Sequence, residues 1–149
     1  MLLRVTGTLI TLLLLAGAGY YTYEQQEPVC DICHRPIHQA SAYLIELDTG
    51  EVVKACCPRC GLRFQEGIGE AAGVEVADFT SGTLVDANDA FYVEDSTITL
   101  CLSQDVLHKD ATGGQYGLSL DRCMPSLIGF RTRADAVAFA RENGGAIRT

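Results

Sequence analysis

The sequence predicts an α+β protein in which an N-terminal membrane anchor precedes a small domain of two ββα-type halves. Three observations support this fold class: an uncharged apolar segment, two Cys-x-x-Cys pairs that bracket a predicted hairpin, and a strand–helix order that ends each half. We place the anchor at residues 1–26, a cysteine-rich metal-binding half at 27–70 and a β-rich half with a C-terminal helix at 71–149.

The N-terminal segment Val5 to Tyr23 carries no charge and is rich in leucine. At 1.5 Å per residue a helix of this length spans about 28 Å, enough for a hydrocarbon core. Arg4 precedes the segment and Glu24 follows it, so the positive-inside rule places the rest of the chain outside the cytoplasm. A cleaved signal peptide is the alternative, because residues 16–18 read Ala-Gly-Ala. Both interpretations predict a domain that faces the periplasm or another extracytoplasmic space.

The composition narrows the choice of partners. The formal net charge is −8 and the sequence contains no basic stripe, which argues against nucleic acid as a partner. Seven cysteines in an extracytoplasmic chain would ordinarily form disulfides, but the number is odd and several are too close in sequence to act as long-range cross-links. The cysteine pattern therefore favours metal ligation.

The first half contains the strongest motif. A hairpin over Tyr43–Lys54, turning at Asp48-Thr49-Gly50, would bring two Cys-x-x-Cys turns side by side. A helix follows, with Cys57 as N-cap and Pro58 as its first residue, and it ends at Gly67 or Gly69. Four thiolates around one point make a tetrahedral zinc site. We therefore predict structural Zn²⁺ on the ligands Cys30, Cys33, Cys57 and Cys60.

Three other chemistries fit the same cysteines. Cys30-Asp-Ile-Cys33-His34 is formally a c-type haem attachment motif, with His34 as axial ligand. Cys57-Pro-Arg-Cys60 at a helix start could serve a thiol–disulfide oxidoreductase, although the preceding βαβ unit of a thioredoxin fold is missing. Two structural disulfides without metal are the remaining alternative.

The second half is predicted from short runs of residues that favour β-strands. Strands are expected at residues 74–79, 84–87, 90–94, 97–102 and 126–130, with a polar loop at 103–121. Thr132 is the predicted N-cap of a helix Arg133–Asn143, which Gly144 and Gly145 end, and residues 146–148 add a last strand.

Two stretches of this half resemble the NosL family, extracytoplasmic copper-binding accessory proteins of nitrous oxide reductase maturation. They are residues 76–93 (VADFTSGTLVDANDAFYV) and residues 130–145 (FRTRADAVAFARENGG), and the Cys30/Cys33 knuckle also matches the start of the family's domain. The resemblance covers most of residues 29–148 and implies an α+β fold of two ββα-type halves. The sequence differs from the family pattern at His34-Arg35, at the additional cysteines 56–60 and at the loop 103–122.

The resemblance also implies Cu(I) as cargo, held by soft ligands. Cys33 falls on the knuckle cysteine of the family and Met124 falls near a methionine of its second half. Thiolates and thioethers select Cu(I) or zinc over hard cations. We therefore expect an exchangeable Cu(I) site at Met124 with Cys123, Cys101 or His108, although a disulfide between Cys101 and Cys123 and a packing role for Met124 are alternatives.

The predicted function is a membrane-tethered copper chaperone or metalloenzyme-maturation factor. Its partners would be a client metalloenzyme or another copper carrier, and the membrane through the N-terminal segment. The sequence contains no catalytic Ser/His/Asp arrangement and no Gly-rich phosphate loop. We therefore predict that the protein is not an enzyme.

Overall fold

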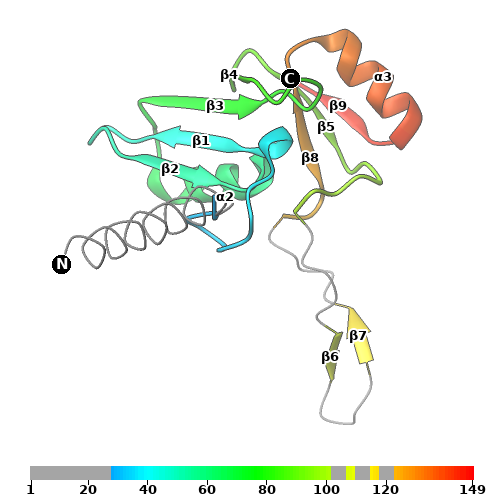
Figure 1. Cartoon of the computed structure of the whole chain (residues 1–149), viewed down its shortest axis with the longest axis horizontal. Helices are drawn as coiled ribbons and strands as arrows, with labels where there is room; N and C mark the ends of the chain where they lie inside the picture. Colours follow the sequence, from blue (N-terminus) through cyan, green and yellow to red (C-terminus); the bar gives the residue numbers. More distant parts are fainter. Residues whose placement is uncertain (1–27, 102–106, 110–114, 118–122) are drawn as a thin grey trace, which may run out of the picture.

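The computed structural model describes residues 28–101, 107–109, 115–117 and 123–149 (Figure 1). The predicted anchor at residues 1–26 and most of the predicted loop 103–121 lie outside this part of the chain. Within the described ranges, none of the helices has the length and apolar character needed to cross a bilayer.

The first sheet has four antiparallel strands in the order β2-β1-β3-β4. The short 3-10 helix η1 (Gln39–Ser41) leads into β1 (Tyr43–Glu46), which forms a hairpin with β2 (Val52–Ala55). The turn between them contains Gly50 at φ +80°, a left-handed conformation that favours glycine. The second edge of β1 pairs with β3 (Gly73–Ala77), and β3 pairs with β4 (Leu84–Asp86).

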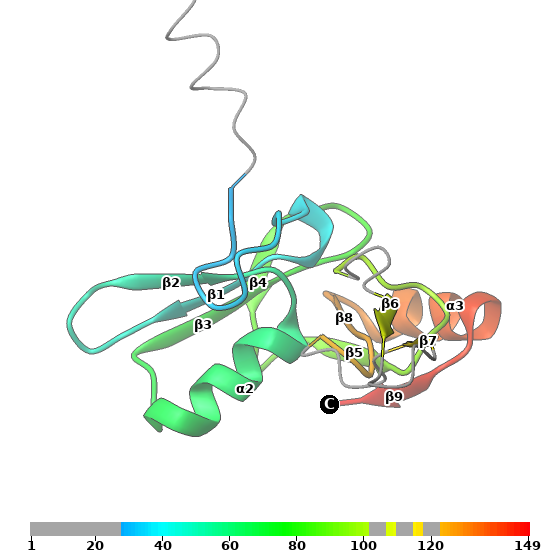
Figure 2. The same cartoon turned by 90° about the horizontal axis from the view of Figure 1, so that it is seen from below.

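Helix α2 (Pro58–Ile68) lies along one face of this sheet, where it contacts β1 and β2 (Figure 2). The predicted start is confirmed: Cys57 is the N-cap and Pro58 is the first helical residue, where its missing N–H costs nothing. The helix ends at Gly69, which adopts a positive φ of 84°. Helix α2 thus fixes the cysteines at its start against the end of β2.

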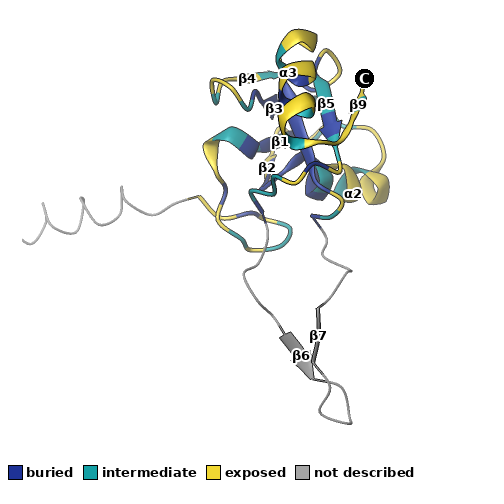
Figure 3. Cartoon of the chain, turned by 90° about the vertical axis from the view of Figure 1, so that its right-hand side faces the viewer, coloured by how far each residue is buried: buried dark blue, intermediate teal, exposed yellow. Residues whose placement is uncertain are grey.

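The second sheet has the order β8-β5-β9 and is covered by α3. Its elements are β5 (Phe91–Glu94), β8 (Leu127–Phe130), α3 (Arg133–Asn143) and β9 (Ala146–Arg148). The rings of Phe79, Phe130 and Phe139 pack with centroids 5.0–5.7 Å apart. Every residue of β8 is buried, because this strand lies between α3 and the first sheet. Most of α3 is exposed on the outside of the domain (Figure 3).

The predicted α+β class is confirmed, with two corrections to its elements. Residues 97–100 form no strand: the backbone N–H of Thr97 donates to the carbonyl of Asn143 at 2.9 Å, and the Ser96 hydroxyl donates to the Ile98 carbonyl at 3.1 Å. The hydrogen bonds of these backbone groups therefore go to a helix end and to a side chain, and not to a neighbouring strand. Two short paired strands, β6 (Leu107–Lys109) and β7 (Gln115–Gly117), lie where only a loop is predicted. The remaining strands and both helices lie within one or two residues of their predicted positions.

The two sheets are joined through a buried carboxylate at the end of β3. Asp78 accepts hydrogen bonds from the Ser81 hydroxyl at 2.6 Å, the Ser81 backbone N–H at 3.1 Å and the Arg131 backbone N–H at 3.1 Å. Burial raises the pKa of Asp78, but these hydrogen bonds outweigh burial and the net pKa is lowered. The ionised form is therefore the one that the fold stabilises.

We expect Asp78→Asn to lower the free energy of unfolding at neutral pH by about 2 kcal/mol, because an amide is a weaker acceptor and leaves a buried donor poorly satisfied. A group with a lowered folded-state pKa stabilises the fold above its unfolded pKa of about 3.9, and this stabilisation is lost as pH falls through the folded value. Urea unfolding at several pH values should show the difference between parent and variant narrowing in acid. The exposed turn residue Asp48→Asn is the control, and an equal loss in both variants would contradict the proposed role.

Candidate metal centre

The first part of the site is a tight turn at Cys30–Arg35. The backbone N–H of Cys33 donates to the sulfur of Cys30 at 3.4 Å, and the N–H of His34 donates to the Cys30 carbonyl at 2.9 Å. His34 closes the turn at φ +60°. Asp31 fastens the turn to β2, since its N–H donates to the Lys54 carbonyl at 2.9 Å and its carboxylate accepts from the Lys54 N–H at 2.7 Å. The two sulfurs are therefore held in place by backbone contacts.

The second part is the junction between β2 and α2. Cys56 follows the last residue of β2, Cys57 caps α2, and Cys60 lies in the first turn of the helix. Cys57 has extended backbone angles (φ −163°, ψ 162°), so Cys56 and Cys57 project in different directions. This geometry sends the two adjacent cysteines into different groups of thiols.

The first group contains four cysteines whose sulfur atoms all lie within 4.8 Å of one another: Cys30, Cys33, Cys56 and Cys60. The Cys30–Cys60 sulfur distance is 4.0 Å and the Cys33–Cys56 distance is 3.4 Å. Four sulfurs at 2.3 Å from a central zinc ion would lie about 3.8 Å apart, between these two values. The group therefore matches a tetrahedral thiolate site.

The second group meets the same 4.8 Å criterion and is entirely buried: Cys56, Cys57, Cys101 and Cys123. Cys56 belongs to both groups, and its sulfur lies 3.6 Å from that of Cys123. Cys101 donates to the Cys56 carbonyl at 2.9 Å, which holds it at the junction of β2 and α2. None of the seven cysteines, all of which lie in the described part of the chain, forms a disulfide.

A cation and hydrogen bonds adjust the charge of these thiols. The Arg35 guanidinium donates to the Cys123 sulfur at 3.4 Å and to the Cys101 carbonyl at 2.7 Å. Hydrogen bonds from neighbouring thiols, that of Cys101 foremost, lower the pKa of Cys123. At Cys56, hydrogen bonds with Cys101, and next with Cys123, raise the pKa. These contacts favour the thiolate form at Cys123 and the thiol form at Cys56, and a metal ion would have to displace the remaining protons.

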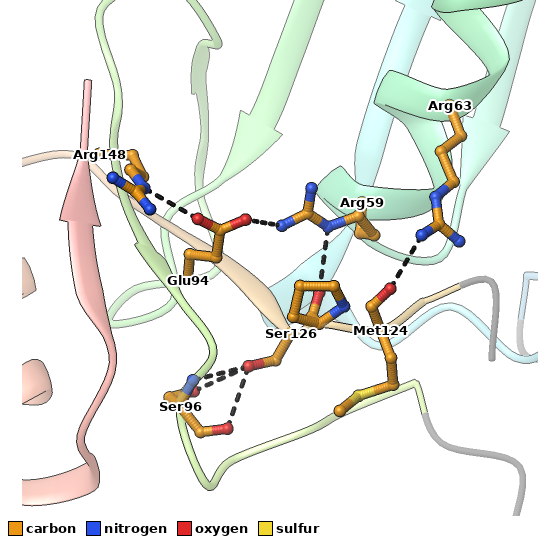
Figure 4. Close-up of polar contacts among 8 residues, drawn as sticks. Arg59, Arg63, Glu94, Ser96, Met124, Ser126 and Arg148 are labelled. Carbon is orange, nitrogen blue, oxygen red and sulfur yellow. Dashed lines mark hydrogen bonds and ion pairs between the residues drawn. The ribbon is translucent and has the colours of Figure 1, made fainter. Parts of the chain in front are cut away.

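Met124 lies beside the second group. It lines a cavity of about 20 Å³ together with Cys57, Cys101 and Cys123. About 10–15 Å³ is enough for one water molecule, so this cavity has room for a single small ligand. The Arg63 guanidinium donates to the Met124 carbonyl at 3.0 Å, and the Met124 side chain points away from this contact (Figure 4). Arg59 donates to the next carbonyl, that of Pro125, at 3.0 Å, so helix α2 fixes the backbone of this segment.

The structure changes the membership of the predicted four-cysteine site. Cys30, Cys33 and Cys60 come together as expected, but Cys56 completes their group and Cys57 lies with Cys101 and Cys123. The one signal in the sequence is that Cys56 directly precedes Cys57 and offers an alternative ligand; in the structure the extended N-cap turns Cys57 away from the first group. Of the predicted copper ligands, Met124, Cys101 and Cys123 lie together. His108 is in β6, and its side chain lies outside the described part of the chain.

The geometry gives little support to the alternative chemistries. A c-type haem needs both knuckle sulfurs free for thioether bonds, whereas those of Cys30 and Cys33 lie among other thiols and His34 is exposed. A redox pair needs two adjacent sulfurs, whereas Cys57 and Cys60 fall in different groups. The arrangement of the thiols is that of a soft metal site.

Comparison with known proteins places the fold. No protein-family model matches the chain, and no curated protein matches it. Among solved structures, the copper chaperone NosL from Shewanella denitrificans aligns with a TM-score of 0.56 and 18% sequence identity, over 81% of this chain and 85% of that chain. The resemblance that residues 76–93 and 130–145 indicate is thus matched at the level of three-dimensional structure, and the chain has a NosL-like fold.

Proposed function

We propose that this protein is a copper chaperone, tethered to the membrane and facing the periplasm or another extracytoplasmic space. This proposal rests on the cluster of seven thiols, six of them buried, with Met124 at its side on a NosL-like fold. Thiolate and thioether are the ligands that Cu(I) prefers. The segment at residues 5–23 carries no charge and follows Arg4, which supports a membrane tether at the N-terminus.

The two groups of thiols would have different roles. All ligands of the first group come from residues 30–60, within one turn–hairpin–helix unit, which is typical of structural zinc. The second group draws Cys101 and Cys123 from distant parts of the chain and borders the cavity that Met124 lines. We assign structural Zn²⁺ to the first group and transferable Cu(I) to the second, as cargo for a metalloenzyme of the nitrous oxide reductase type or for another copper carrier.

A competition titration tests the copper assignment. The reduced full-length protein, loaded with zinc, should take up Cu(I) from a chromophoric chelator under anaerobic conditions. Met124→Leu should weaken this binding about tenfold, because leucine keeps the volume but removes the thioether, and a tenfold change is about 1.4 kcal/mol. Cys123→Ser should weaken it further, since a thiolate is the stronger ligand.

Two controls sharpen this experiment. His38→Asn changes an exposed histidine outside both groups and should leave Cu(I) affinity unchanged. Thermal unfolding of the zinc-loaded, copper-free proteins should show Met124→Leu within about 1.5 kcal/mol of the parent, as expected for a volume-conserving change. Equal Cu(I) affinity in the parent, Met124→Leu and Cys123→Ser would show that the second group is not the copper site.

A further inference from the structure

Cys56 is the one cysteine that belongs to both groups of thiols in the described chain. Its side chain is fully buried, with its sulfur 3.4 Å from that of Cys33 in the first group and 3.6 Å from that of Cys123 in the second. The two groups have four cysteine positions each, and the seven cysteines of the chain fill these eight positions because one sulfur is counted in both groups. The sulfur that lies between the two groups is that of Cys56.

We propose that the thiolate of Cys56 bridges two metal ions, so that the seven cysteines form one binuclear centre. This inference rests on the proposed metal-binding function and adds that its two sites are physically one cluster. With each ion about 2.3 Å from the shared sulfur, the two ions lie at most about 4.6 Å apart. A thiolate keeps three lone pairs, and in the centre two of them each donate to one ion.

Charge favours the shared ligand over two separate sites. Zn²⁺ and Cu(I) on eight thiolates would bury five net negative charges, whereas on seven thiolates with one bridge they bury four. Because uncompensated buried charge is costly, each thiolate that is saved stabilises the centre. The Arg35 guanidinium, 3.4 Å from the Cys123 sulfur, offsets part of the remainder. On loading, every cysteine gives its thiol proton to solvent and its sulfur forms one bond to metal, or two at Cys56.

Sharing a ligand couples the two sites. An ion in the first group ionises Cys56 and fixes its sulfur, so the second ion meets a ligand that is already deprotonated and oriented. The second ion in turn draws electron density away from the first. The affinity of each site therefore depends on occupancy of the other, by the same factor in both directions. A structural ion would in this way set the affinity of the transferable one.

Cobalt(II) is a suitable probe, because it occupies tetrahedral thiolate sites and is paramagnetic. The reduced full-length protein should bind two Co²⁺, as counted by native mass spectrometry. Its high-spin electron paramagnetic resonance signal should grow during the first equivalent and fall during the second, because a bridging sulfur couples the two spins antiferromagnetically. One bound ion, or two ions whose signals add, would overturn the bridge. Such a result would leave the Cu(I) competition as a separate test of the proposed function.

Matched serine variants locate the bridge. Cys33 belongs only to the first group and Cys57 only to the second, so Cys33→Ser and Cys57→Ser should each weaken one ion and leave the other bound. Cys56→Ser should weaken both ions and abolish the loss of signal. A Cys56→Ser protein that binds two coupled ions would contradict the proposal. The titration of the parent needs no variant, so the proposal stays testable if Cys56→Ser does not fold.

Discussion

Stripping the metal from the loaded protein with a strong chelator should unfold its cysteine-rich part and leave the second sheet folded. The reason lies in how the two cores are built. Six of the fourteen buried residues in the first core cluster are cysteines. The second cluster contains none, and consists of Val93, Ile128, Phe130, Ala136 and Phe139.

The larger apolar side chains of the first core are those of Ile37, Tyr43, Ile45, Val53 and Val76. Six thiols take up much of the remaining space in this core. A buried thiol contributes less apolar surface than leucine or phenylalanine, so burial alone stabilises this half weakly. For structural thiolate sites, binding zinc contributes about 10 kcal/mol or more at neutral pH, and that binding energy is folding energy. The metal therefore replaces part of the missing hydrophobic core.

Hydrogen exchange read by mass spectrometry checks this expectation. Chelation should remove protection from β1, β2 and α2, while β5, β8 and α3 keep most of theirs. Returning zinc should restore protection in the first group of segments. Protection that is unchanged after verified metal removal, or lost evenly along the chain, would show that the thiols are not a structural centre.

Local sequence signals predicted the elements of this fold well. Thr132 caps α3 as expected, accepting from the Asp135 N–H at 3.2 Å, and α3 has its predicted bounds. Pro58 and Gly69 mark the ends of α2. Such caps depend on a few adjacent residues, which is why they can be read without knowledge of the rest of the chain.

Features that depend on distant contacts could not be predicted in this way. The pairing of β1 with β3 puts strands from both predicted halves into one sheet, and no local pattern encodes that choice. The division of Cys56 and Cys57 between two groups depends on the extended backbone of an N-cap and on Cys101 and Cys123 arriving from elsewhere. Arg35 reaches Cys123 across 88 positions of sequence. The composition thus indicated a site for soft metal ions, whereas the grouping of the cysteines into one centre could be seen only in the folded structure.

Gly61→Ala should lower the free energy of unfolding by about 3 kcal/mol, although the same change in most helices stabilises them. Gly61 is buried in α2, immediately after Cys60, and a Cβ at this position would collide with the Tyr43 ring. Tyr43 cannot move aside freely: it is 2% exposed, and its hydroxyl donates to the Gln65 side chain at 2.8 Å. The helix would have to move away from the sheet and would displace Cys60 from its group.

Gly67→Ala is the matched control, because it makes the same change in the same helix. No atom lies within 4 Å of a Cβ added at Gly67, so only the backbone effect remains there. Replacing a helical glycine by alanine gains up to about 1 kcal/mol, so Gly67→Ala should be neutral or stabilising. Opposite signs for the two variants in urea unfolding would attribute the loss at Gly61 to the ring contact. Equal effects would contradict it.

The ionisation of Tyr43 provides a second measurement. Burial raises the pKa of Tyr43 to about 12, so its neutral form stabilises the fold, and this stabilisation is lost as pH rises from about 10 through that value. If Gly61→Ala forces the helix off the ring, water reaches Tyr43 and its pKa should fall toward 10 in an ultraviolet titration, whereas Gly67→Ala should titrate like the parent. Zinc affinity should fall in Gly61→Ala alone, since only there does Cys60 move. A destabilised Gly61→Ala protein with unchanged tyrosine titration and zinc affinity would show that the junction of β1 and α2 does not position the metal ligands.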